Sequence, residues 1–313
     1  MAIETPWKLI FKALSNPNYS IKENYELHRK VITASRPFFK PFYKMFDKKI
    51  KTNGREIPIR IFMPRNKKAP KDIIVFFHGG GWVTGNVNNY TSICGNMANQ
   101  TNCIVISVEY RLAPEHPFPE GLNDCYSVTR IIAANITKEA QKEKNLNKEK
   151  RRLILSGDSA GGNLAAVVSL LSKDNKGFTI DKQILYYPSC YNDYSEDSPF
   201  ESVRLYGEDY VLTNKRIKEY LDLYIENEED FNSPLFAPLL AEDVSNQPDT
   251  LIITAEFDPL RDEGEAYGHK LKKAGNKVVV KRIEDSLHGF LALPKNSDII
   301  KICYEYVNDF LET

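Results

Sequence analysis

Short apolar runs alternate with longer stretches of helical periodicity along most of the chain. Six runs rich in β-branched residues recur, and several are apolar nearly throughout, as is typical of strands covered on both faces in a parallel sheet. These runs are residues 73–77, 103–108, 152–156, 183–187, 250–254 and 277–283. Helical periodicity occupies stretches between them, as at residues 163–171 and 262–274. The alternation predicts an α/β fold, with a mostly parallel central sheet covered by helices on both faces.

Two regions depart from this alternation. Residues 1–43 read as helical, and Pro37 and Pro41 mark the end of the helical pattern. Residues 188–247 are rich in Tyr, Asp, Glu, Ser and Pro, and contain one clear helix at 214–224. We expect both segments to lie over one end of the sheet as a helical cap, so that residues 1–313 form a single domain.

A hairpin is expected where the sheet begins. Residues 45–51 and 56–63 flank the dipeptide Asn53-Gly54, which is a strong signal for a two-residue hairpin turn. The first strands of the sheet are therefore predicted to be antiparallel.

Composition and charge exclude several classes of protein. The chain has 313 residues, of which 42% are hydrophobic, and its 42 basic side chains balance 42 acidic ones. Zero net charge disfavours a nucleic-acid partner, and together with this hydrophobicity it disfavours disorder. No apolar run approaches the roughly 20 residues of a membrane span, and residues 1–20 do not read as a signal peptide. We therefore expect a cytoplasmic protein with no membrane association.

The cysteines indicate neither a disulfide framework nor a zinc site. They are odd in number and lack C-x-x-C spacing. The five are Cys94, Cys103, Cys125, Cys190 and Cys303.

A serine on a sharp turn is the first candidate for chemistry. The apolar run 152–156 leads into Gly157-Asp158-Ser159-Ala160-Gly161, and a helical pattern follows. A nucleophilic serine held on a strained strand-to-helix turn needs small neighbours, because strand and helix approach closely there. The bare G-x-S-x-G pattern is weak, but a strand before it and a helix after it favour a nucleophile over an ordinary glycine-rich turn.

A glycine-rich loop is the second candidate. Three consecutive glycines follow the strand 73–77, in His78-Gly-Gly-Gly-Trp82. Such a backbone can direct N–H groups at a developing oxyanion, as acyl transfer requires. We expect donors from Gly80 and Gly81, with the N–H of Ala160 as a third. A phosphate-binding turn is the alternative, but neither G-x-G-x-x-G nor the P-loop pattern is present.

A serine nucleophile needs a base, and one of the five histidines fits that role by its position. His288 follows the strand 277–283 in a loop at the strand's carboxyl end, which is where ligands bind in open α/β sheets. We expect His288 to be the base. The others are more simply structural: His28, His78, His116 and His269.

The acid that orients this base is expected at another strand end. Asp258 lies just past the run 250–254, and the chain order Ser, Asp, His is that of α/β hydrolases. The rival carboxylates nearby are Glu256, Asp262 and Asp285. Asp262 is better placed to interact with the dipole of the following helix.

Together these motifs resemble the hormone-sensitive-lipase-like family of α/β hydrolases, bacterial family IV, which contains acetyl esterases and other short-chain carboxylesterases. The resemblance runs from about residue 45 to the C-terminus. It rests on His78-Gly-Gly-Gly-Trp82, Glu109-Tyr-Arg-Leu-Ala-Pro-Glu-His-Pro-Phe-Pro119, Gly157-Asp-Ser-Ala-Gly-Gly162, Asp258-Pro-Leu-Arg-Asp262 and His288-Gly-Phe290.

The resemblance implies the α/β-hydrolase fold, a catalytic triad of Ser159, Asp258 and His288, and an oxyanion hole of Gly80, Gly81 and Ala160. It also implies that His78 holds the glycine loop in shape and that Arg111 ties loops together. Residues 1–43 and 188–247 would form the cap.

The predicted function is a serine carboxylesterase that acts on short-chain acyl esters, acetyl to butyryl in size, with water as the second substrate. No metal or organic cofactor is expected. An amidase or arylformamidase would use the same triad, and turnover of an N-acyl substrate against its matched ester separates them. A non-catalytic receptor is a further alternative, since plant gibberellin receptors share this fold, but they lack the catalytic histidine.

Residues that contact the substrate are harder to predict. Trp82 and several side chains of the expected cap are candidates, although packing within the cap is the simpler interpretation for each. These cap residues are Phe38, Phe39, Phe42, Leu205, Tyr206 and Tyr210. The oligomeric state is expected to be monomer or homodimer. Strand 277–283 and the helical pattern 297–311 are a candidate dimer surface, although a helix that covers the sheet is the preferred interpretation.

Overall fold

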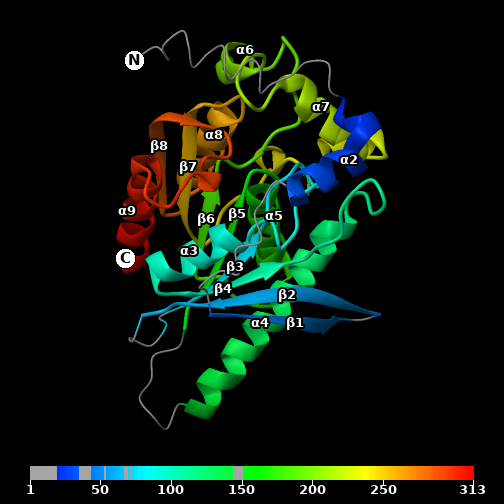
Figure 1. The fold of residues 1–313 in the computed structure, drawn as a ribbon. Helices are drawn as coiled ribbons and strands as arrows, with labels where there is room; N and C mark the ends of the chain where they lie inside the picture. The colour runs from blue at the N-terminus through cyan, green and yellow to red at the C-terminus, as the bar shows by residue number, and fades with distance from the viewer. Residues whose placement is uncertain are drawn as a thin grey trace.

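One sheet runs through the centre of the computed structural model, which describes residues 20–34, 44–52, 54–66, 70, 72–143, 151–175 and 177–313 (Figure 1). Its eight described strands have the order β1-β2-β4-β3-β5-β6-β7-β8. They are β1 (Lys44–Thr52), β2 (Arg55–Met63), β3 (Ile73–Phe77), β4 (Ile104–Val108), β5 (Leu153–Asp158), β6 (Lys182–Tyr186), β7 (Asp249–Phe257) and β8 (Val278–Leu287). All pairings from β4 to β8 are parallel.

The antiparallel start of the sheet is confirmed. Strands β1 and β2 pair antiparallel from Lys44 with Met63 to Thr52 with Arg55, and β2 pairs antiparallel with β4. Gly54 lies at the turn with a φ of +94°, a backbone conformation that glycine adopts without strain. Asn53, the other residue of the predicted turn, lies outside the described residues.

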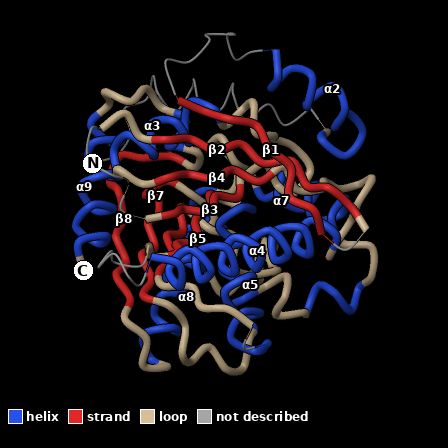
Figure 2. Tube along the Cα trace, turned by 90° about the horizontal axis from the view of Figure 1, so that it is seen from below, coloured by secondary structure: helices blue, strands red, loops and turns tan. Residues whose placement is uncertain are grey.

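Helices cover both faces of the sheet, as predicted (Figure 2). The helices are α2 (Ile21–Ala34), α3 (Thr91–Thr101), α4 (Glu120–Glu143), α5 (Ala160–Asn175), α6 (Glu201–Tyr206), α7 (Asn214–Tyr224), α8 (Arg261–Lys273) and α9 (Asp298–Glu312). Three short 3-10 segments complete the described elements: Glu228–Asn232, Pro238–Leu240 and Phe290–Ala292.

The alternation of side chains along buried strands divides the core into two layers. Val75 and Phe77 of β3 belong to the layer that α4, α5 and α8 cover. Their neighbours Ile74 and Phe76 belong to the opposite layer, under α3 and α9. All five residues of β3 are buried, which is why the strand is apolar throughout and carries no polar face.

Three helices gather beyond the carboxyl ends of β3, β5 and β7: α2, α6 and α7 (Figure 1). The N–H of Ile21 on α2 donates to Glu219 on α7 at 2.7 Å, and Lys22 pairs with Asp222 at 2.9 Å. Helix α7 has the bounds predicted for it, whereas α6 was not predicted. Of the predicted helical segment 1–43, the structure describes residues 20–34.

The five cysteines are all buried and free, so none of them belongs to a disulfide. Among the helices of the described ranges, none is long and apolar enough to cross a membrane.

Candidate active site

Ser159 occupies the sharp turn between β5 and α5. Its φ is +55°, a left-handed conformation that a non-glycine residue rarely adopts. The turn is tight, because a Cβ at Gly157 would overlap the carbonyl of Gly161, and a Cβ at Gly161 would overlap that of Phe77. The N–H of Ser159 donates to the carbonyl of Tyr186 at 2.9 Å. The two glycines of the motif are therefore required by packing, and the turn presents the Ser159 hydroxyl to His288.

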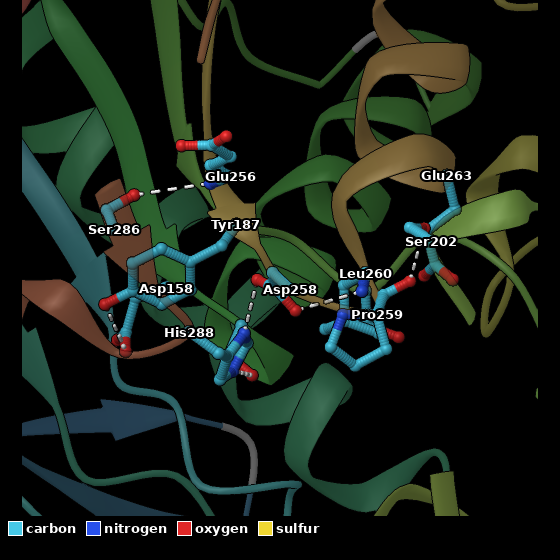
Figure 3. Close-up of polar contacts among 12 residues, drawn as sticks. Asp158, Tyr187, Ser202, Glu256, Asp258, Pro259, Leu260, Glu263, Ser286 and His288 are labelled. Carbon is cyan, nitrogen blue, oxygen red and sulfur yellow. Dashed lines mark hydrogen bonds and ion pairs between the residues drawn. The ribbon is translucent and has the colours of Figure 1, made fainter. Parts of the chain in front are cut away.

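The structure brings Ser159, His288 and Asp258 together from three strand ends. The distance between Ser159 Oγ and His288 Nε2 is 2.9 Å, and that between His288 Nδ1 and Asp258 Oδ2 is 2.7 Å. The other carboxylate oxygen of Asp258 accepts the N–H of Leu260 at 2.9 Å, and Figure 3 shows Asp258 between His288 and Leu260. Because Asp258 accepts the hydrogen at Nδ1, Nε2 is left free to accept one from the serine hydroxyl.

The glycine-rich loop lies beside the serine. Gly80 and Gly81 have φ values of +115° and +61°, which glycine tolerates without strain. The carbonyl of Gly80 accepts the N–H of Thr84 at 2.8 Å and closes the loop on itself. Within the described ranges, the N–H groups of Gly80, Gly81 and Ala160 donate to no other group. Gly80, Gly81 and Ala160 all line one cavity together with Ser159. This arrangement can receive an oxyanion.

A cavity of about 190 Å³ is lined both by Ser159 and His288 and by the glycine-rich loop. Helix α7 forms its roof through Ile217 and Tyr220. The ring of Tyr220 packs so closely on Gly81 that a Cβ there would overlap it. Glycine at position 81 therefore serves two purposes, since it permits the positive φ and leaves room for the tyrosine.

Comparison with known proteins identifies the family of the chain. A family model described as the α/β-hydrolase fold matches residues 74–292. The chain belongs to the α/β-hydrolase family.

Several relatives of this hydrolase are named as esterases. An arylesterase of Saccharolobus solfataricus is 38% identical over 252 residues, which cover 80% of this chain and 78% of that protein. The carboxylic ester hydrolase LipN of Mycobacterium tuberculosis is 34% identical over 271 residues, 85% of this chain and 69% of that protein. The structure of the Pyrobaculum calidifontis esterase superposes with a TM-score of 0.80 at 31% identity, covering 99% of this chain and 100% of that one. The resemblance of the motifs to hormone-sensitive-lipase-like hydrolases is confirmed.

The rival carboxylates of this hydrolase have other contacts. Glu256 accepts the N–H of Asp285 at 2.7 Å, and in Figure 3 it points away from His288. Asp262 accepts the N–H of Ser202 at 2.7 Å and pairs with Arg261 at 2.8 Å. Of the carboxylates considered from the sequence, Asp258 is the one that contacts His288.

Asp158 and His78 hold the hydrolase's glycine loop in place. The buried carboxylate of Asp158 accepts the N–H of Gly79 at 2.8 Å and the hydroxyl of Tyr90 at 3.0 Å. His78 is fully buried, and its Nδ1–H donates to the carbonyl of Gly79 at 2.9 Å. Burial lowers the pKa of His78 to about 4. The ring is therefore neutral at physiological pH and cannot act as a protonated general acid.

Glu263 fixes the segment that follows β6. This segment contains Ser189, another residue of the cavity wall. One of its carboxylate oxygens accepts the N–H groups of Cys190 and Tyr191 at 2.6 and 3.1 Å and the hydroxyl of Tyr194 at 2.9 Å. Burial, with a smaller contribution from Asp258, raises the pKa of Glu263 to about 8.

Of the residues predicted to contact substrate, Trp82 lines the cavity. Tyr206 and Tyr210 do not: they pack edge to face at 5.1 Å, and Tyr210 stacks on Phe257 at 5.8 Å. Leu205 is exposed on α6, whereas Phe38, Phe39 and Phe42 lie outside the described residues.

Sequence reasoning did not predict several residues of the wall, among them Tyr90, Ser189, Leu212, Ile217 and Tyr220. The position of Ser189 just after a strand was a usable signal, because strand ends in this fold face the ligand. Ile217 and Tyr220 are one helical turn apart, but the pattern of α7 alone does not say which face turns to the serine.

Proposed function

We propose that the protein is a serine carboxylesterase that hydrolyses short-chain acyl esters, acetyl to butyryl in size, through an acyl-enzyme intermediate. It is a carboxylic ester hydrolase by its family and its esterase relatives. The observation that carries the serine mechanism is the relay from Ser159 Oγ through His288 to Asp258, with distances of 2.9 and 2.7 Å.

In the first step, Ser159 Oγ attacks the ester carbonyl carbon while His288 Nε2 accepts the hydroxyl proton. The carbonyl oxygen becomes negatively charged, and the N–H groups of Gly80, Gly81 and Ala160 stabilise that charge. Collapse of the tetrahedral intermediate breaks the bond to the alcohol oxygen, which leaves with the proton from His288. An acyl-serine remains.

In the second step, water attacks the acyl-serine and gives its proton to His288. The second tetrahedral intermediate uses the same three N–H groups. Its collapse returns the proton to Ser159 Oγ and releases the carboxylic acid. Asp258 keeps the imidazole in the tautomer with hydrogen on Nδ1 and stabilises the cation formed in each step.

The short-chain preference is supported by the size of the cavity. Its volume of about 190 Å³ is below the roughly 300 Å³ at which pockets for drug-sized ligands begin. Ile217 and Tyr220 close it from the side of α7. An acetyl or butyryl group fits within such a space, whereas a long acyl chain requires the roof to move.

We assign residues 1–313 to a single α/β-hydrolase domain, with cap elements at 1–43 and about 188–247. The close contact of α7 with the glycine loop and its ties to α2 support a cap that covers the site. A cytoplasmic location, the absence of a nucleic-acid or membrane partner and a monomeric or homodimeric state stay predictions.

The test is a rate series with p-nitrophenyl acetate, butyrate, octanoate and palmitate, for the wild type and Ser159→Ala. Rates are expected to be highest for acetate or butyrate and to vanish in the variant. Ser172→Ala is the matched control, because the Ser172 hydroxyl donates to the carbonyl of Ser169 within α5 and lies away from the cavity.

Activity that survives in Ser159→Ala would refute Ser159 as the nucleophile. A wild type that is folded but inactive on every ester would refute the esterase. Matched N-acyl p-nitroanilides, run beside the esters, identify an amidase or arylformamidase if the amide is turned over faster.

A further inference from the structure

Arg29 of α2 reaches the glycine-rich loop from a distant part of the chain. Its Nε–H donates to the carbonyl of Val83 at 2.7 Å, and an N–H of Nη2 donates to the carbonyl of Ala113 at 2.7 Å. The same guanidinium forms two hydrogen bonds with the carboxylate of Glu115, at 2.8 and 2.9 Å. All three N–H-bearing nitrogens are therefore engaged.

The two carbonyls belong to segments that are themselves joined. The N–H of Ala113 donates to the carbonyl of Trp82 at 3.0 Å, so the loop that ends at Val83 lies against the turn at Ala113. Both Val83 and Ala113 are fully buried. Arg29 spans this junction and holds both backbones with one planar, charged group, whose hydrogen bonds are stronger and more directional than those between neutral groups.

The position of Val83 gives these bonds their significance. Val83 follows Trp82, which has a φ of +59°, and the N–H of Val83 donates to the carbonyl of Gly80 at 3.2 Å. The peptide planes from Gly80 to Val83 are thus linked, so that the orientation of one constrains the orientation of the others. A rotation at Val83 would be transmitted to the N–H groups of Gly80 and Gly81.

Helix α2 has other anchors that do not involve this loop. Ile21 and Lys22 tie it to α7 through Glu219 and Asp222. Holding α2 on the molecule therefore does not depend on Arg29 alone, and the two bonds to loop carbonyls require a separate explanation.

We propose that Arg29 is a positioning residue for the oxyanion hole: it fixes the orientation of the loop that supplies the Gly80 and Gly81 donors. The inference rests on the proposed esterase function. It follows that the N-terminal cap helix contributes to transition-state stabilisation, although Arg29 does not itself contact the reacting atoms.

The test compares Arg29→Met, Arg29→Lys and the control Lys22→Met, which changes a cation on the same helix that pairs with Asp222 of α7. Active sites are first counted with a p-nitrophenyl phosphonate, so that kcat is expressed per reactive serine. We then measure kcat and KM for p-nitrophenyl acetate and the inhibition constant of a trifluoromethyl ketone, whose adduct places an oxyanion in the loop.

Removal of a whole oxyanion donor lowers kcat by about 100- to 1,000-fold. Loss of a residue that positions donors should lower kcat by a smaller factor, and we expect about a 10-fold fall in kcat for Arg29→Met. The inhibition constant of the ketone should rise by the same factor while KM stays within about twofold. Arg29→Lys retains a charged donor, so its kcat and ketone inhibition constant should lie between those of Arg29→Met and the wild type. Both constants of Lys22→Met should match those of the wild type.

Three results would overturn the inference. One is an unchanged kcat per titrated site in Arg29→Met, even with a lowered melting temperature, because that would make Arg29 purely structural. Another is a rise in KM with no change in kcat, which would mean that Arg29 affects substrate access rather than the oxyanion hole. A third is a fall in kcat without weaker ketone binding. If Arg29→Met does not fold, Arg29→Lys decides by the same criteria. A wild type without esterase activity would instead refute the proposed function, and this inference with it.

Discussion

Replacing Asp258 by asparagine tests the relay most sharply, because the exchange keeps the shape of the side chain. Asp258 is fully buried. Its Oδ1 accepts the backbone N–H of Leu260 at 2.9 Å, and its Oδ2 accepts Nδ1–H of His288 at 2.7 Å. An asparagine must keep its carbonyl oxygen toward Leu260, since that partner can only donate, and so must turn its NH₂ group toward His288.

The consequence is a change of tautomer. Nδ1 of His288 would accept from the amide, and Nε2 would carry the hydrogen and could no longer take one from Ser159. The same exchange in proteases with this arrangement lowers kcat by about 10⁴-fold, which corresponds to about 5 kcal/mol of activation free energy. We expect a loss of about 10³- to 10⁴-fold here, because Leu260 leaves the amide only one orientation.

The assay is hydrolysis of p-nitrophenyl acetate by Asp258→Asn, with thermal unfolding to verify that the variant is folded. Glu256→Gln is the control: this nearby carboxylate contacts the N–H of Asp285 rather than His288, and its rate should stay within about twofold of the wild type. A rate for Asp258→Asn within tenfold of the wild type would refute the tautomer argument. An equal loss in Glu256→Gln would refute the choice of acid.

Two further predictions concern the roof and the buried acid. Tyr220→Ala removes the ring that packs on Gly81 and should raise the ratio of octanoate to acetate hydrolysis by about tenfold. That factor corresponds to about 1.4 kcal/mol, roughly the free energy of burying two more methylene groups of the acyl chain. An unchanged ratio would exclude Tyr220 as a limit on chain length. For Glu263, burial raises the pKa to about 8, so the folded protein binds a proton that the unfolded chain has already released. The free energy of unfolding should therefore fall as pH rises from the ordinary glutamate range to about 8, by up to about 1.4 kcal/mol per pH unit. Glu263→Gln keeps an acceptor for Cys190 and Tyr191 and should flatten that slope in urea unfolding measured between about pH 5 and pH 8; an identical slope in the variant would contradict the assignment.

The central sheet was predictable because its strands are buried on both faces. The run 73–77 has no polar position, and the structure places β3 between two helical layers. The relay was predictable for a related reason. Ser159, Asp258 and His288 each follow a parallel strand, and the carboxyl ends of such strands meet at one edge, so residues far apart in the chain come together there.

The cavity wall was not predictable in the same way. Whether Ile217 and Tyr220 or Tyr206 and Tyr210 face the serine depends on how α6 and α7 dock. That docking involves contacts with segments distant in the chain, α2 for α7 and α8 for α6. The bond from Arg29 to Val83 joins residues 54 positions apart, and no local pattern in either segment indicates it. Glycine at position 81 likewise reads as a flexible residue, although it also makes room for a tyrosine ring on another helix.

The buried cysteines give the protein a practical property. Burial raises the pKa of all five thiols, to about 11 for Cys103 and further for the others. Since the thiolate is the reactive form, maleimide and nitroxide reagents should leave the native chain unmodified. A single cysteine introduced at Lys218, which is exposed on α7, would then carry a spectroscopic label selectively. Such a label would test whether α7 moves during turnover, without removal of any native cysteine.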